Sequence, residues 1–217
     1  LTKYLVMRAG KVTAVEFDEE LYRKLPKSIT ADNLTIVHDD CLKFDYNSLP
    51  MGYKVVANIP YYLTSNLLRV LSEAQNPPAI IVLLVQKEVA ERVAAIPGKM
   101  SLLSVSVQLY YTASLDMVVP AELFTPPPKV DSQIIKLVRR DKPLFENLNS
   151  ELFFRIVKAG FSQRRKKLRS SLSAGMHISK DAVEELLQTA GIDAHSRPQE
   201  LSLEQWHLLY LQFTKKQ

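Results

Sequence analysis

Short, almost wholly apolar runs alternate with helical patterns through the first hundred residues of this chain. The apolar runs are residues 12–17, 34–37, 53–57 and 80–85, and helical spacing is found at 19–24, 63–74 and 87–95. This alternation predicts βαβ units around a parallel sheet. Strands that are apolar at nearly every position indicate a sheet covered on both faces. The first half of the chain is therefore predicted to be an α/β domain.

Polar side chains stand where three of these runs end. Glu16 closes the first run, Asp40 follows the second, and Asn58 follows the third. In open α/β sheets, ligands bind outside the carboxyl ends of the strands. Asp39 competes with Asp40 on composition alone. The sequence predicts a ligand site at this edge of the sheet.

The second half of the chain changes character. The predicted elements are a strand-like stretch over 102–119, a rigid loop over 124–128, a strand over 134–138, a polar linker over 141–149, and helices from 150 with breaks at Gly175, Gly191 and Pro198. Near the start, residues 1–9 read as the end of a helix capped by Gly10, and the helix at 19–24 is expected to stop before Pro26. We predict two domains, 1–143 and 144–217.

Composition narrows the class of protein. Of the 217 residues, 47% are hydrophobic and 24% charged, as in ordinary globular proteins. The longest apolar run, 79–85, is far shorter than a membrane span. The single cysteine excludes an internal disulfide framework and suits a reducing cytoplasm. The four histidines lack metal-ligand spacing, so we expect no metal. We also expect no membrane partner, and we expect the protein to be a monomer.

Positive charge is concentrated in the last third of the chain. The net charge is +5, and the residues from 150 onward supply +4 of it. Seven basic side chains with no acid between them fall within residues 155–169. Such density can bind phosphates. A solvated helix surface is the alternative that the sequence leaves open.

The tetrad Asn58-Ile59-Pro60-Tyr61 suits chemistry on a nucleobase amine. The lone pair of such an amine is delocalised into the ring, which makes the amine a poor nucleophile. A site can activate the amine by accepting hydrogen bonds from both of its N–H groups. The Asn58 side-chain oxygen and a carbonyl of Ile59 or Pro60 could accept them. Tyr61 offers a face on which a base can stack. A simple strand-to-helix turn is the alternative.

The tetrad resembles motif IV of S-adenosylmethionine-dependent adenine-amine methyltransferases, and other segments extend the match in order. They are Leu1-Thr2, residues 15–18, residues 40–44, residues 84–89, residues 124–132 and residues 161–172. Together they resemble the KsgA-type small-subunit (16S) ribosomal RNA adenine N6,N6-dimethyltransferases over essentially the whole chain. The resemblance implies a Rossmann-like class I methyltransferase sheet with a small C-terminal helical domain.

The resemblance also implies roles for single residues. Glu16 would accept hydrogen bonds from the cofactor ribose, Asp40 would accept one from the cofactor adenine amine, and Cys41 would lie beside that ring, with no nucleophilic role. Phe17 would line the cofactor pocket. Asn58 would stand between S-adenosylmethionine and the base, and Phe124 would pack on the base opposite Tyr61. A core position is the alternative for both phenylalanines.

The residues expected to bind RNA are those of the family's basic C-terminal helix, namely Arg164, Arg165, Lys166, Lys167 and Arg169. On one helix they would spread around the circumference, with Phe161 and Leu168 facing inward. The expected partner is small-subunit ribosomal RNA or a small ribosomal particle, and the expected role is in ribosome biogenesis. The alternatives are a methyltransferase acting on large-subunit RNA or on DNA, and a non-catalytic ribosome-assembly factor. A nicotinamide dehydrogenase would need a catalytic His or Lys at the strand ends.

One feature of the family pattern has no counterpart here. The family places a glycine-rich turn, after the first strand, just before the position of Leu1. The chain has only six glycines, and none forms G-x-G. We therefore expect the first strand and half of the cofactor site to be missing. Calorimetric titration of the 217-residue chain is expected to show poor binding of S-adenosylmethionine.

Overall fold

The computed structural model describes residues 1–163 and 165–215. Its helices are α1 (Thr2–Val6), α2 (Glu19–Ser28), α3 (Thr64–Glu73), α4 (Lys87–Val93), α5 (Leu102–Gln108), α6 (Ser150–Phe161), α7 (Leu168–Met176), α8 (Lys180–Thr189) and α9 (Leu203–Lys215). Its strands are β1 (Val12–Glu16), β2 (Leu34–His38), β3 (Lys54–Asn58), β4 (Ile80–Gln86), β5 (Tyr111–Val119) and β6 (Ser132–Arg139). The four strands predicted in the first half are confirmed. In the described part of the chain, no helix is long and apolar enough to cross a membrane.

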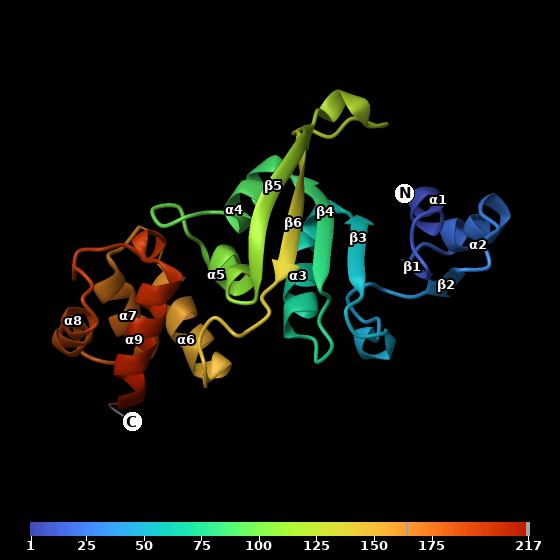
Figure 1. The fold of residues 1–217 in the computed structure, drawn as a ribbon. Coiled ribbons are helices and arrows are strands. Elements are labelled where there is room, and N and C mark those ends of the chain that lie inside the picture. The colour runs from blue at the N-terminus through green and yellow to red at the C-terminus, as the bar shows by residue number, and fades with distance from the viewer. Residues whose placement is uncertain (164, 216–217) are drawn as a thin grey trace.

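The strands form two separate sheets. β1 and β2 pair in parallel, with Glu16 opposite His38. The other sheet has the order β3-β4-β6-β5, in which β3 and β4 are parallel and β6 runs antiparallel to β4 and β5. Figure 1 shows the β1–β2 pair standing apart from the larger sheet, beyond β3. The sheet is thus mixed, and the parallel arrangement predicted from the sequence applies to its first strands.

Burial of the larger sheet is one-sided. Ile81, Leu83 and Val85 of β4 are fully buried, whereas the alternate residues of this strand are half-buried. Helices α4 and α5 contact β4, β5 and β6, and α3 packs against α5 (Figure 1). On the opposite face of the sheet, Val56 and Val138 are exposed. The predicted burial of the sheet on both faces is therefore wrong for the described residues, because the second face is only partly covered.

Two hydrophobic cores hold the molecule together. The first joins α3 to β4 and β6. The second lies among α6, α7, α8 and α9 around Trp206, and it includes Met100, Val105 and Leu109 of the α5 region. Helix α5 therefore contributes to both cores. The division into domains at 143/144 remains a prediction, and it does not coincide with a break in packing.

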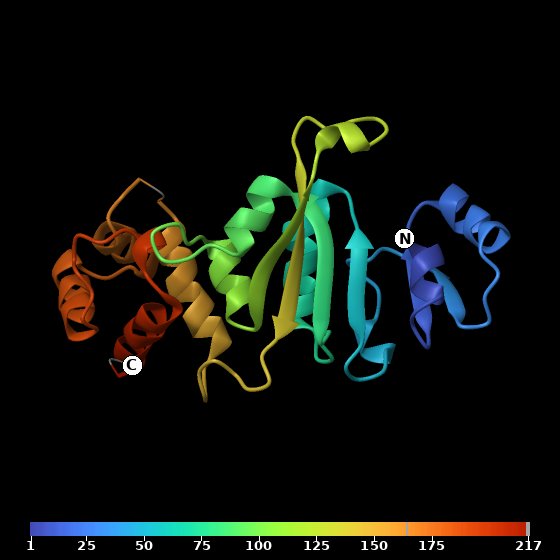
Figure 2. The same cartoon turned by 45° about the horizontal axis from the view of Figure 1, so that its top comes forward.

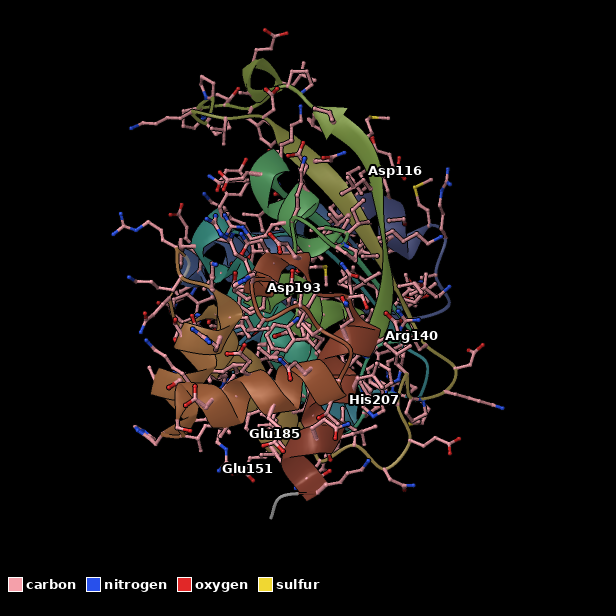
Figure 3. All side chains as sticks on the ribbon, turned by 90° about the vertical axis from the view of Figure 1, so that its left-hand side faces the viewer. Asp116, Arg140, Glu151, Glu185, Asp193 and His207 are labelled. Atoms are coloured by element: carbon pink, nitrogen blue, oxygen red, sulfur yellow. The ribbon has the colours of Figure 1, made fainter. Side chains whose placement is uncertain are left out.

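The two cores are joined by main-chain hydrogen bonds as well as by apolar contacts. The Gln199 carbonyl accepts from the N–H groups of Gly98 (2.9 Å) and Met100 (3.1 Å). The Arg140 side chain donates from Nε to the Gln108 carbonyl (3.1 Å), where β6 leaves the sheet for the helices (Figure 3). The bonds to Gln199 fix the loop before α5 against the helical part of the chain, and the Arg140 side chain fixes the end of α5 against the end of β6.

Three local expectations are wrong, each for an identifiable reason. Residues 102–108 form a helix, because Ser101 and Ser104 make a reciprocal capping box that starts α5. Helix α2 continues past Pro26 and closes its last turn with the Ile29 N–H on the Leu25 carbonyl. Gly10 is not a cap, because α1 has already ended and Met7 is its C-cap.

Gly175 does not break the helices either, because it lies inside α7. A Cβ at this position would come within 2.6 Å of the Ala159 Cβ, so glycine allows α6 and α7 to approach closely. The break falls at His177, which has a left-handed backbone conformation with φ of 56°.

Candidate active site

Glu16 and the turn after β2 lie side by side at one end of the β1–β2 pair. The Asp39 N–H donates to the Glu16 carbonyl (3.1 Å), extending the parallel pairing beyond the strands. The Asp18 N–H donates to Glu16 Oε1 (2.9 Å), which fixes the carboxylate. No described group donates to its other oxygen. Glu16 thus keeps an acceptor available at the carboxyl end of the strand.

Asp40 begins a tight turn. Its Oδ1 accepts from the Leu42 N–H (2.9 Å), and its own N–H donates to Asp39 Oδ1 (2.7 Å). The neighbouring Cys41 is half-buried, and its carbonyl accepts from the Tyr46 hydroxyl (2.7 Å). Burial, followed by the nearby Asp40 carboxylate, raises the pKa of the Cys41 thiol. A thiol with a raised pKa stays neutral at physiological pH, and a neutral thiol is a poor nucleophile.

Phe17 is not a core residue, because 72% of its side chain is exposed. Its carbonyl lies 3.0 Å from His38 Nε2, and the His38 ring stacks on Tyr22 with 4.9 Å between centroids. The contact between the Phe17 carbonyl and His38 could not be predicted from the sequence, because it depends on the pairing of β1 with β2. Exposure of Phe17 excludes the core position, and its place beside a cofactor stays a prediction.

The tetrad from Asn58 to Tyr61 continues directly from β3. Asn58 is the last residue of the strand, pairs with Leu84, and has an exposed side chain. The Pro60 carbonyl accepts from the Leu63 N–H (3.0 Å) and so starts the 3-10 turn Tyr61–Leu63. The Ile59 carbonyl receives no hydrogen bond from a described residue. Of the two carbonyls that the sequence proposed as acceptors, Ile59 is therefore the one left available.

The Tyr61 ring is held from the neighbouring strands. Its hydroxyl lies 2.6 Å from Ser132 Oγ, and Ser132 is fully buried at the start of β6. Ser132 pairs with Gln86 on one side and Val119 on the other. Ser132 belongs to the predicted motif over residues 124–132, and no role was predicted for it. Its contact joins residues 71 positions apart, which sequence spacing cannot show.

Phe124 lies in the loop that connects β5 to β6, and it is half-buried. This loop contains a cis peptide bond between Thr125 and Pro126. Asp131 fastens it, since its Oδ1 accepts from the Ala121 N–H (3.0 Å) and its carbonyl accepts from the Lys87 N–H (3.0 Å). Figure 1 shows the loop beyond the end of the sheet at which β3 and β4 finish.

The structure therefore gathers the predicted site residues into two groups. Glu16, Phe17, Asp40 and Cys41 share the end of the β1–β2 pair. The tetrad and the loop that carries Phe124 share the end of the larger sheet. β1 and β3 belong to different sheets, and Figure 2 shows the two units side by side without a common strand.

The basic segment is not one continuous helix, contrary to expectation. Helix α6 ends at Phe161, and α7 begins at Leu168. Leu168 is fully buried and Phe161 packs on the second core, so their inward orientation is confirmed. Lys167 Nζ lies 3.0 Å from His195 Nδ1, and Arg169 forms an ion pair with Glu184.

Arg165 and Lys166 are exposed in the turn between α6 and α7. Arg164 lies outside the described residues. Among the described cations of the segment, Arg165 and Lys166 have no recognised side-chain partner and are exposed, and the role of the segment in RNA binding stays a prediction. Among residues 1–163 and 165–215, no group of three or more His, Cys, Asp or Glu side chains could hold a metal ion.

Comparison with known proteins gives one consistent family. A family model described as "Ribosomal RNA adenine dimethylase" matches residues 1–215. A "Ribosomal RNA small subunit methyltransferase A" of Dehalococcoides mccartyi is 42% identical, over 99% of this chain and 75% of its own length. A protein of the same name from Bacillus pumilus is also 42% identical, over 95% of this chain and 75% of its own length.

Solved structures agree with the fold. The "23S rRNA methyltransferase ErmE" is similar with a TM-score of 0.77 and 28% identity, over 98% of this chain and 86% of its own. A dimethyladenosine transferase from Plasmodium falciparum is similar with a TM-score of 0.81 and 25% identity, over 99% of this chain and 86% of its own. The Rossmann-like class I methyltransferase architecture with a C-terminal helical part is thereby confirmed.

Proposed function

Because the chain belongs to the ribosomal RNA adenine dimethylase family, we propose that it dimethylates the exocyclic amines of adenines in small-subunit ribosomal RNA, with S-adenosylmethionine as methyl donor. The observation that carries this proposal is the tetrad at the end of β3, with an exposed amide at Asn58 and an available carbonyl at Ile59. The similarity to small-subunit methyltransferases favours this substrate over large-subunit RNA. A cytoplasmic enzyme of ribosome biogenesis fits these observations.

The residues at the end of β1 and β2 fit the proposed methyl donor. Glu16 has one carboxylate oxygen that no described group occupies, which suits a ribose hydroxyl. Asp40 is half-buried, and only its Oδ1 is engaged by the turn, so its Oδ2 can accept from an adenine amine. When bound, S-adenosylmethionine supplies a methyl group carried on a sulfonium. The available oxygens of these two carboxylates therefore match the hydroxyl and amine donors of the methyl donor.

The tetrad acts on the base. Asn58 Oδ1 and the Ile59 carbonyl accept the two amine N–H bonds, which orients the nitrogen lone pair toward the methyl group. Positive charge would develop on the nitrogen as its bond to the methyl carbon forms and the bond from that carbon to sulfur breaks, with a neutral thioether as the leaving group, and these two oxygens would stabilise the charge. The proton that leaves the nitrogen passes to water, so no general base is required. Tyr61 stacks on the base, which must be unpaired or flipped out of a helix to reach it.

The decisive test uses S-adenosylmethionine labelled in its methyl group, at a concentration high enough to compensate for the weak binding expected of this chain, and small ribosomal subunits that lack the modification. Label is expected in two methyl groups on adenines of the small-subunit RNA. Label in large-subunit RNA alone would overturn the substrate assignment. Binding to small subunits without any methyl transfer would identify a non-catalytic assembly factor instead.

Replacing Glu16 by glutamine is expected to raise the KM for S-adenosylmethionine by about 10- to 100-fold, with a smaller effect on kcat. A hydrogen bond to a charged group contributes roughly 1.5–3 kcal/mol, and the uncharged amide loses most of it. Steady-state kinetics at varied S-adenosylmethionine measures the effect. Glu151→Gln, on the exposed start of α6 (Figure 3), is the matched control. An unchanged KM would remove Glu16 from the cofactor site.

Ser132 is proposed as a positioning residue that acts through Tyr61. Ser132→Ala is expected to lower kcat for methyl transfer by about 3- to 30-fold, because the 2.6 Å contact that orients the ring is lost. RNA binding should not change. Tyr61→Phe removes the same contact, so the double variant should be no slower than either single variant. Independent, multiplying losses in kcat would show that Ser132 acts by another route.

A further inference from the structure

A groove runs between α3, α5 and α6, on the helix-covered side of the sheet. It has a volume of about 410 Å³, within the range of ligand-binding cavities. Helix α3 forms one wall, α5 forms the floor, and α6 forms the other wall. We call it the α3–α6 groove. None of the residues proposed above for cofactor or base binding lines it.

Three cations from three different helices line the groove: Arg69 of α3, Arg92 of α4 and Lys158 of α6. Arg92 pairs with Glu88 (2.6 Å) and Arg69 with Glu73 (3.8 Å), both as exposed pairs one helical turn apart. Such pairs are weak, so a phosphate can compete for either arginine. No ion pair is recorded for Lys158 within the described residues. Since Glu73 is the only acidic residue in the lining, the groove favours an anionic ligand.

The same groove offers aromatic surface and an unused hydroxyl. Tyr110 and Phe154 line it, with 6.5 Å between ring centroids, and both are half-buried. Ser72 also lines it and is only 8% exposed, and its hydroxyl has no hydrogen-bond partner among the described residues. Cations beside a partly open aromatic face are the features with which proteins hold single-stranded nucleic acid.

The groove connects the two regions that the proposed function requires. Ser65 of the lining stands in the first turn of α3, directly after the 3-10 turn that carries Tyr61. Lys158 and Ser101 of the lining also line a second hollow of about 440 Å³. Phe161 and Ser162 line that hollow as well, just before the exposed Arg165 and Lys166.

We propose that the α3–α6 groove binds a single-stranded segment of the RNA substrate, with phosphates on Arg69, Arg92 and Lys158 and a base against Phe154. The inference rests on the proposed function, because it assigns the groove to the same RNA. In A-form duplexes the bases are stacked inside the helix, so an aromatic groove of this size suits unpaired nucleotides. The bound strand leads from the basic turn toward Tyr61.

The experiment measures binding of a fluorescent ten-nucleotide adenosine oligoribonucleotide to the full chain at several salt concentrations, without S-adenosylmethionine. Arg92→Gln and Lys158→Gln are each expected to weaken binding about 3- to 10-fold and to reduce the salt slope by about 0.7. Phe154→Leu is expected to weaken binding about tenfold with an unchanged slope, because stacking is lost and no charge is removed. Thermal unfolding of each variant shows that it is folded.

Arg23→Gln is the matched control, because Arg23 is also paired with a glutamate one turn away, on α2 and outside the groove. It should bind like the unaltered chain. Equal affinities and slopes for all groove variants would overturn the proposal, as would equal binding of a hairpin duplex of the same length. Displacement by adenosine monophosphate at the oligonucleotide's own concentration would also overturn it, by assigning the groove to a free nucleotide. Failure of methyl transfer alone would contradict the proposed function and leave this binding result intact.

Discussion

Asn58→Ala is expected to slow methyl transfer by about 10²- to 10³-fold while leaving RNA affinity within twofold of the unaltered chain. In the proposed function, the side-chain oxygen of Asn58 accepts a hydrogen bond from a nitrogen that gains positive charge in the transition state. Loss of one such preorganised group costs a factor of this size in kcat. Single-turnover methyl transfer and filter binding to small ribosomal subunits measure the two quantities separately.

Two further variants make this prediction sharper. Asn58→Asp keeps an acceptor of the same shape, so it should retain more activity than Asn58→Ala. Gln188→Ala removes an exposed amide from α8, far along the chain from the tetrad, and should have no effect on either measurement. Parallel losses of RNA affinity and methyl transfer in Asn58→Ala would assign Asn58 to substrate binding instead of the chemical step.

Trp206→Ala is expected to lower the free energy of unfolding by about 3–5 kcal/mol, because it empties the centre of the second core. Trp206 is fully buried and packs on Phe161, with 5.5 Å between ring centroids. Urea unfolding followed by circular dichroism measures the change. A loss below about 1 kcal/mol would mean that the core closes over the missing ring.

Gly160 provides an internal control for this second prediction. A Cβ at Gly160 would lie 2.5 Å from Cη2 of Trp206, so Gly160→Ala should destabilise the chain by about 1–3 kcal/mol. In the Trp206→Ala background the contacts with the ring are gone, and only the contact of the new Cβ with Leu168 Cδ1, at 3.0 Å, remains. The gain of about 1 kcal/mol in helix propensity then offsets part of the cost. The destabilisation by Gly160→Ala should therefore be smaller in the Trp206→Ala background than in the unaltered chain. Destabilisation of equal size in both backgrounds would contradict the proposed packing.

The strands were predictable because each one is a short apolar run that ends at a polar residue, and the structure places β1 to β4 within one or two residues of the predicted runs. Helix α5 was missed because its valines and leucines read as a strand. Two serines at its start decide the outcome by satisfying free N–H groups. Local capping thus outweighed the apolar pattern at this point.

The site was predictable as far as its residues are contiguous in sequence. The tetrad at the end of β3 could be predicted from its own residues. The contact between Tyr61 and Ser132 could not be predicted, because it depends on β6 entering the sheet beside β4. The availability of Arg165 and Lys166, in contrast with the ion-paired Arg169, likewise depends on where α6 ends and α8 packs.

The two hydrogen bonds that the Gln199 carbonyl accepts from Gly98 and Met100 use only main-chain atoms. Their strength is therefore nearly independent of the side chains at Gln199 and Met100, provided that Met100 does not become proline. Gly98 has φ of 100°, a backbone conformation that favours glycine. Sequence drift in this loop can proceed while the spacing between the α5 region and the helical part is preserved. The amides of Gly98 and Met100 should accordingly appear in hydrogen exchange as a protected pair within a loop, and such protection would show that this loop stays docked on the helical part of the chain in solution.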